Sequence, residues 1–156
     1  MYINEDIITS YFDRPASDFK PAVAVVGYGY GDYVAMRKGG KLCTPNNPID
    51  ISLFGTSFPT LEQMESASPC RMVSENTPPM FLWCTSQDEL VPSEQTLIMG
   101  LALARQGIDY EIHVFEKGKH GYSLADQSTA SHDYQISESV AKWTDLVKPW
   151  LYDHIP

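Results

Sequence analysis

The chain has 156 residues, of which 43% are hydrophobic and 20% are charged, and its formal net charge is −9. The length suits one globular domain with its own core, the negative charge argues against nucleic acid and anionic membranes as partners, and no apolar run approaches the ~18 residues that span a bilayer. We therefore expect a globular protein that binds neither nucleic acid nor membrane.

The three cysteines, Cys43, Cys70 and Cys84, follow no regular spacing. An odd, irregular set argues against a disulfide framework, and the acidic start of the chain does not resemble a secretory leader. A reducing cytoplasm is therefore the expected compartment. Cys84 lies in an apolar run and is expected to be a buried small side chain. The alternative, a cysteine nucleophile, is disfavoured because no sharp turn surrounds this residue.

Residues 1–20 are polar and aromatic without a clear period, and they are expected to form an N-terminal arm ahead of a folded part at 21–156. The folded part opens with Ala22–Val26, a β-branched run that is typical of a parallel strand buried on both faces. The glycine-rich stretch 27–32 lacks the third glycine of the dinucleotide fingerprint G-x-G-x-x-G. We interpret it as a turn at the exit of the strand, and we expect no cofactor.

Residues 37–60 are rich in glycine, proline and asparagine, and they are predicted to be a loop or insertion. Thr60 and Gln63 then carry the signature of a capping box, which predicts a short helix. Near the end of the chain, an apolar stripe predicts a helix over Ile136–Tyr152. We expect this helix to kink or restart at Pro149, because proline removes a helical hydrogen-bond donor.

Between these segments the chain reads as strand, helix and strand. Pro78-Pro79 lead into the apolar strand Met80–Cys84, since proline is tolerated where a strand begins. The helix Ser93–Gln106 has a broad apolar face suited to covering a sheet, and Gly107 ends it. The second strand is Tyr110–Phe115. A strand–helix–strand order of this kind predicts two parallel neighbours in one sheet.

An acid and an imidazole follow the ends of these two strands. Asp88 comes just after the first strand, with Glu89 as the competing acid, and His120 follows the second strand between glycines. Parallel neighbours place both side chains at the same edge of the sheet, where open α/β sheets bind their ligands. A carboxylate that orients an imidazole is the acid–base part of a serine-hydrolase triad. His113 lies within a strand and is expected to be a packed or surface residue. His132 and His154 have no partner at metal-ligand spacing, so no metal site is expected.

The stretch Asn76–Leu124 resembles the C-terminal part of the α/β-hydrolase superfamily, in its esterase/lipase branch with sugar-ester and xylan-esterase-like members. The matching residues are Thr77-Pro78-Pro79, Asp88, Val91-Pro92, Gly118, His120 and Gly121. The resemblance implies that Asp88 is the triad acid and His120 the general base. It also implies that residues 21–156 form a partial α/β-hydrolase fold, with a three-stranded parallel sheet flanked by helices, and that the substrate is a small ester or an acylated sugar.

The nucleophile of such enzymes is a serine in G-x-S-x-G, ahead of the acid and the histidine in chain order. The nearest string here is Gly55-Thr56-Ser57-Phe58-Pro59, which has proline in place of the second glycine. We therefore expect the C-terminal portion of a serine esterase, inactive alone unless another chain supplies the serine. The alternative is a non-catalytic, truncated remnant that acts as a self-associating module.

The resemblance also predicts an exposed sheet edge. In the family, the strand that corresponds to Ala22–Tyr28 pairs with an inner strand that has no counterpart in this sequence. An open apolar edge is a site for pairing with another copy. We therefore predict a homo-oligomer through the exposed strand Ala22–Tyr28, formed as a homodimer by antiparallel pairing of Val23–Val26 across a two-fold axis.

Overall fold

The core of the protein is a three-stranded sheet, seen in a computed structural model that describes residues 10–39 and 47–155. The strands are β1 (Ala24–Gly27), β2 (Met80–Thr85) and β3 (Tyr110–Phe115). Both pairings are parallel and the spatial order is β1-β2-β3. The predicted three-stranded parallel sheet flanked by helices is confirmed. Residues 1–9 of the predicted arm and Cys43 lie outside the described residues.

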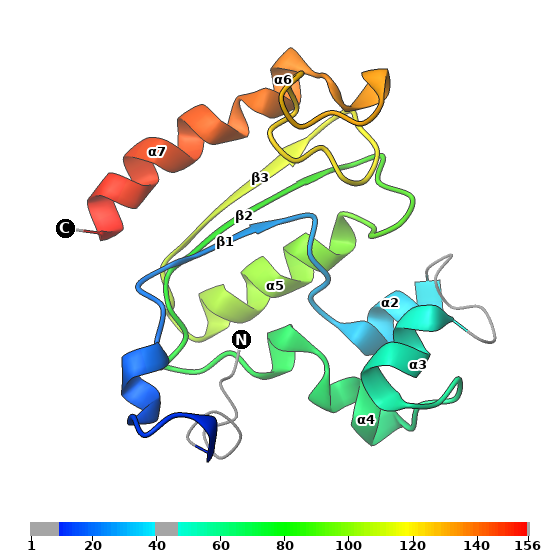
Figure 1. Cartoon of the computed structure of the whole chain (residues 1–156), viewed down its shortest axis with the longest axis vertical. Helices are drawn as coiled ribbons and strands as arrows, with labels where there is room; N and C mark the ends of the chain where they lie inside the picture. Colours follow the sequence, from blue (N-terminus) through cyan, green and yellow to red (C-terminus); the bar gives the residue numbers. More distant parts are fainter. Residues whose placement is uncertain (1–9, 40–46, 156) are drawn as a thin grey trace.

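Helices cover both faces of this sheet (Figure 1). Successive side chains of a strand point to opposite faces, so the fully buried strand β2 supplies two separate cores. Phe81 and Trp83 pack with α7 (Trp143–His154), whereas Met80 and Leu82 pack with α5 (Glu94–Arg105). The predicted strands and the helix before Gly107 are therefore correct to within a few residues. Because β2 is covered on both faces, none of its side chains faces solvent, and this explains why its sequence is apolar throughout.

The predicted final helix is two helices, α6 (Glu138–Ala141) and α7. The break lies at Lys142, while Pro149 sits inside α7, so the predicted restart point was wrong. Ser137 caps α6 by accepting a hydrogen bond from the Val140 N–H. On either side of Pro149, Val147 and Trp150 are buried against the sheet. This burial offsets the one helical hydrogen bond that proline cannot make.

Three short helices lie together beyond the sheet (Figure 1): α2 (Tyr33–Gly39), α3 (Pro48–Phe54) and α4 (Leu61–Ser66). We call them the α2–α4 region. The loop or insertion predicted over 37–60 was wrong for residues 48–54, where Asn47 caps α3 by accepting from the Ile49 N–H and Gly55 ends the helix at φ 68°. Residues 40–46 of this range lie outside the described residues. Asparagine–proline at the start and glycine at the end are typical of a helix. The same three residue types are also typical of loops, which is why the composition of the segment predicts a loop. The capping box of Thr60 and Gln63 is confirmed.

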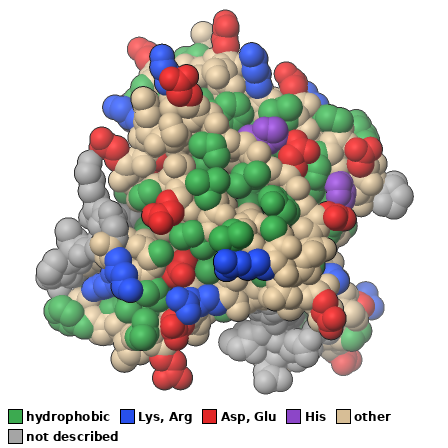
Figure 2. Space-filling view, turned by 180° about the vertical axis from the view of Figure 1, so that it is seen from behind, with side chains coloured by type: hydrophobic (Ala, Val, Ile, Leu, Met, Phe, Trp, Pro, Cys, Tyr) green, Lys and Arg blue, Asp and Glu red, His purple; other side chains and the backbone are tan. Residues whose placement is uncertain are grey.

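The remaining described segments are short. They include the 3-10 turns η1 (Ala16–Phe19), η2 (Pro69–Arg71) and η3 (Asp133–Gln135). Within the described ranges, no helix has the length and apolar character needed to cross a membrane. The face turned away in Figure 1 shows apolar side chains gathered near its centre, with charged side chains mostly around them (Figure 2).

Candidate active site

Asp88 lies in the turn between β2 and α5, with its side chain fully buried. Its Oδ1 accepts hydrogen bonds from the N–H groups of Leu90, at 2.8 Å, and Val91, at 2.9 Å. Its Oδ2 lies 2.8 Å from Nδ1 of His120. One oxygen therefore orders the turn and the other orients the imidazole. Hydrogen bonds to a carboxylate are stronger than those between neutral groups, so this acid is rigidly held.

The loop after β3 carries His120 between two glycines with positive φ, Gly118 at 135° and Gly121 at 84°. A Cβ atom on Gly118 would lie 2.7 Å from Cγ2 of Thr85, so only glycine fits there. The Thr85 hydroxyl donates to the Lys119 carbonyl at 3.2 Å, and Nε2 of Gln135 donates to the Gly121 carbonyl at 2.6 Å. The histidine is thus held from β2 and from η3.

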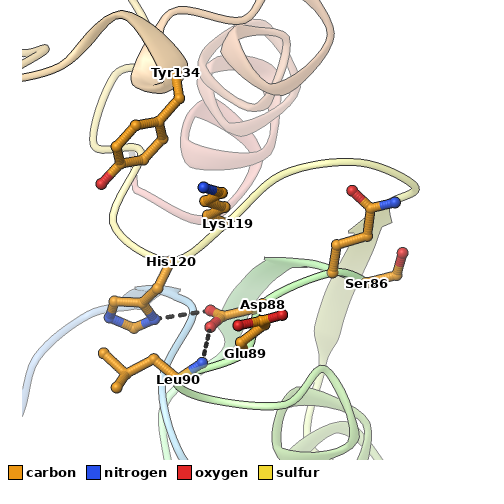
Figure 3. A pocket seen from close by; sticks show the side chains of 8 residues that line it. Ser86, Asp88, Glu89, Leu90, Lys119, His120 and Tyr134 are labelled. Atoms are coloured by element: carbon orange, nitrogen blue, oxygen red, sulfur yellow. Dashed lines mark hydrogen bonds and ion pairs between the residues drawn. The ribbon is translucent and has the colours of Figure 1, made fainter.

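The imidazole of His120 can accept a proton at its outer nitrogen. In the tautomer whose Nδ1–H faces the Asp88 carboxylate, the lone pair of the neutral imidazole is on Nε2. Figure 3 shows one ring nitrogen on the Asp88 carboxylate and the other pointing away from it. The His120 side chain is 29% exposed, so Nε2 can be reached from outside. This arrangement suits a general base.

A cavity of about 1040 Å³ is lined in part by Asp88 and His120. Lys119 and Tyr134 stand on its far wall in Figure 3, with Nζ of Lys119 5.1 Å from the centre of the Tyr134 ring. A cation at this distance from a ring is attracted to it. The lining residues are Ser86, Gln87, Asp88, Glu89, Leu90, Lys119, His120 and Tyr134.

Glu89 could compete with Asp88 as the acid, and Cys84 or Ser57 could act as the nucleophile, but their burial and position argue against these roles. Glu89 is exposed at the cavity, and the acid in hydrogen-bond contact with the imidazole is Asp88. Cys84 is fully buried, and burial raises the pKa of its thiol. A thiol kept in its protonated form is a poor nucleophile. Ser57 lies in the turn between α3 and α4, where its carbonyl accepts from Arg37, and not on a strand-to-helix elbow.

Within the described residues, no serine hydroxyl is hydrogen-bonded to His120, and the hydroxyl of Ser86 at the cavity donates to the Glu116 carbonyl. In the same part of the chain, no three His, Cys, Asp or Glu side chains gather as a metal site. Tyr28 is a site residue that the sequence did not reveal. Its ring centre lies 4.8 Å from that of His120. No periodicity or motif could indicate this contact, since β1 is brought to the site only by the fold.

A protein-family model described as BD-FAE matches residues 3–103 of the chain. Among curated proteins, the endo-1,4-beta-xylanase B of Butyrivibrio fibrisolvens is 37% identical over 68 residues, which are 44% of this chain and 11% of that protein.

Solved structures share the fold. A sugar hydrolase from Lactococcus lactis has a TM-score of 0.71 and 25% identity, over 95% of this chain and 54% of that one. An acetyl ester-xyloside bifunctional hydrolase from Caldicellulosiruptor lactoaceticus has a TM-score of 0.68 and 30% identity, over 85% of this chain and 42% of that one. A carboxylesterase from Lactobacillus plantarum has a TM-score of 0.68 and 26% identity, over 85% and 44%. The chain therefore spans about half the length of these structures.

Proposed function

The chain belongs to the BD-FAE family, an α/β-hydrolase esterase family, and we propose that it carries the acid and the base of a serine-esterase site. In this proposal Asp88 is the acid and His120 is the general base. One observation carries it: a fully buried carboxylate, fixed by two backbone N–H groups, lies 2.8 Å from the imidazole nitrogen. A buried, oriented acid of this kind is what holds a histidine in the tautomer that catalysis requires.

The proposed reaction is hydrolysis of a carboxylic ester. Nε2 of His120 takes the proton of a serine hydroxyl as its oxygen attacks the ester carbonyl, and the protonated imidazole then returns that proton to the leaving alcohol. Asp88 stays ionised and stabilises the imidazolium. Water repeats the sequence on the acyl-serine and releases the acid. In this proposal the serine comes from a G-x-S-x-G segment that this sequence does not contain.

Acylated sugars are the proposed substrates. The support is the family, together with resemblance to a sugar hydrolase, an acetyl ester-xyloside hydrolase and a xylanase. The cavity beside the pair fits this choice, because an aromatic ring and charged groups suit a ligand with both apolar and hydroxyl-bearing faces.

The test is a chimera in which this chain replaces the aligned region of the Lactococcus lactis sugar hydrolase. We expect it to hydrolyse p-nitrophenyl acetate and acetylated xylose, and Asp88→Asn to lower kcat by roughly 10⁴-fold, the size of effect known for this change in a triad. Glu89→Gln distinguishes the two acids, and Asp145→Asn, on the exposed face of α7, is the matched control. A folded chimera that keeps its activity after Asp88→Asn contradicts the proposal.

A second candidate is a self-associating module without catalysis. The observation that favours it is the outer edge of β1, which no other described strand covers and where Val25 is 41% exposed. An uncovered strand edge invites pairing with another chain. We propose that two copies pair through Ala24–Gly27. Sedimentation of the chain as a monomer at micromolar concentration contradicts this pairing, and leaves the esterase proposal untouched.

A further inference from the structure

Tyr28, directly after β1, has an unusual backbone. Its φ is 44°, and within the described residues only Ser123 and Ala125 are other non-glycine residues with positive φ. Bulky side chains rarely adopt this conformation. Strained backbone persists only where the surroundings impose it, and such residues concentrate at functional sites.

The end of β1 is fixed by its neighbour β2. The Tyr28 N–H donates to the Trp83 carbonyl at 2.7 Å, and the two rings meet edge to face with centres 5.0 Å apart. Gly27 makes this possible, because a Cβ atom there would lie 2.8 Å from the indole of Trp83. The Trp83 indole thus packs directly against the backbone of Gly27, and its contact with the Tyr28 ring fixes the direction in which that ring points.

The ring projects onto the catalytic pair. Its centre lies 4.8 Å from that of His120, with the planes at 67°. The Tyr28 hydroxyl accepts a hydrogen bond from the Ser123 N–H at 3.3 Å, and Ser123 itself has φ 51°. The Ser123 carbonyl in turn accepts from Nε1 of Trp143 at 2.9 Å. Two strained residues from distant parts of the chain are therefore joined by one hydrogen bond beside the histidine.

We propose that Tyr28 is a positioning residue for His120, an inference that rests on the proposed function. A single hydrogen bond from Nδ1 to Asp88 leaves the imidazole free to tilt about that bond. The Tyr28 ring lies against the imidazole and restricts the tilt, while its hydroxyl fixes the loop that follows the histidine. The ring packing keeps Nδ1 on the acid and Nε2 directed outward. Glycine or asparagine would relieve the backbone strain at this position but could not supply the ring.

The experiment uses the whole chain and proton NMR of the His120 Nδ1–H, which does not require a nucleophile. We expect the wild type to show a downfield Nδ1–H resonance that Asp88→Asn abolishes. In Tyr28→Gly, solvent exchange of this proton should be about ten-fold faster than in the wild type, measured where the variant is still folded. Tyr28→Phe keeps the ring and should retain the resonance, with faster exchange of the Ser123 amide only. Tyr152→Phe, at an exposed position on α7, is the control.

Each result decides between the roles. An unchanged Nδ1–H in folded Tyr28→Gly overturns the positioning role. Tyr28→Asn, which also tolerates positive φ, replaces the glycine variant if that variant does not fold. If neither Tyr28→Gly nor Tyr28→Asn folds while Tyr28→Phe does, the ring is required for folding itself, and the positioning role is overturned. If the resonance is absent from the wild type, or if Asp88→Asn leaves it unchanged, the acid–base pair of the proposed function fails instead.

Discussion

The sheet with its two covering helices and the α2–α4 region are built in different ways. The sheet is stabilised by large apolar side chains that meet from distant parts of the chain, with Phe81 and Leu82 almost entirely buried on its two faces. The α2–α4 region combines a few buried apolar side chains on α2 with local caps and a buried polar cluster. In that cluster, Asp50 accepts from the Tyr33 hydroxyl at 2.6 Å and pairs with Arg37.

This difference in packing makes the sheet, which carries Asp88 and His120, more rigid than the α2–α4 region. Asp88 and His120 leave strands whose positions are set by cooperative packing, so their contact has little freedom. Capped short helices are marginal on their own, and a polar cluster contributes less net stability than apolar burial of the same extent. We therefore expect the α2–α4 region to open locally, at a lower free energy than the sheet, while the acid–base pair stays intact.

Removing a core ring should have the largest effect. Phe81→Ala leaves a cavity between the sheet and α7, where the ring packs 5.7 Å from that of Trp150. We expect a loss of about 3–5 kcal/mol in the free energy of unfolding, measured by urea denaturation. Phe58→Ala is the matched change in the α2–α4 region, where that ring is 74% exposed, and should be nearly neutral. Equal losses contradict the contrast between the two regions.

Breaking the polar cluster should have an intermediate and local effect. Asp50→Asn removes the charge that pairs with Arg37, and we expect a cost of about 1–3 kcal/mol. The cost should appear as faster amide exchange and proteolysis in the α2–α4 region, while the His120 Nδ1–H resonance persists. Asp145→Asn, which breaks an exposed pair with Lys148, is the control and should change little. If Asp50→Asn lowers the global free energy of unfolding as much as Phe81→Ala does, the sheet and the α2–α4 region unfold as one cooperative unit.

The smallest effect comes from two glycines in equivalent positions. Gly55 ends α3 at φ 68° and Gly107 follows α5 at φ 65°, and a Cβ atom would meet nothing within 4 Å at either. Alanine should therefore cost only the backbone strain, about 1 kcal/mol at each site. Gly107→Ala should lower the global denaturation midpoint. Gly55→Ala should change amide exchange in α3 alone, and an equal shift of the global midpoint would argue against local opening.

The same contrast explains what the sequence could predict. The side chains of the strands and of α5 fill the core, so these segments have apolar patterns. Those patterns allow the strands and the helix to be predicted from the sequence. Helix α3 has no such pattern, and its signal lies in the three terminal residues Asn47, Pro48 and Gly55, within a segment that otherwise reads as a loop.

For the site, strand ends and motif spacing indicated Asp88 and His120. The side chains that hold the histidine loop come from other parts of the chain: Thr85 from β2, Gln135 from η3 and Tyr28, the residue directly after β1. Their contacts arise only when the chain has folded, and nothing in their local sequence marks them. The proximity of Asp88 and His120 could therefore be predicted, whereas the contacts that support it required the structure.

The order of the strands has a consequence for the time course of folding. Asp88 and His120 follow consecutive strands joined by the single helix α5, whereas β1 is separated from β2 by the whole α2–α4 region. The entropy lost on closing a loop grows with its length, and distant pairings form more slowly. We therefore expect the strands that carry Asp88 and His120 to pair first. Tyr28 should then reach the imidazole only when β1 pairs with β2, after the β2–α5–β3 segment has formed.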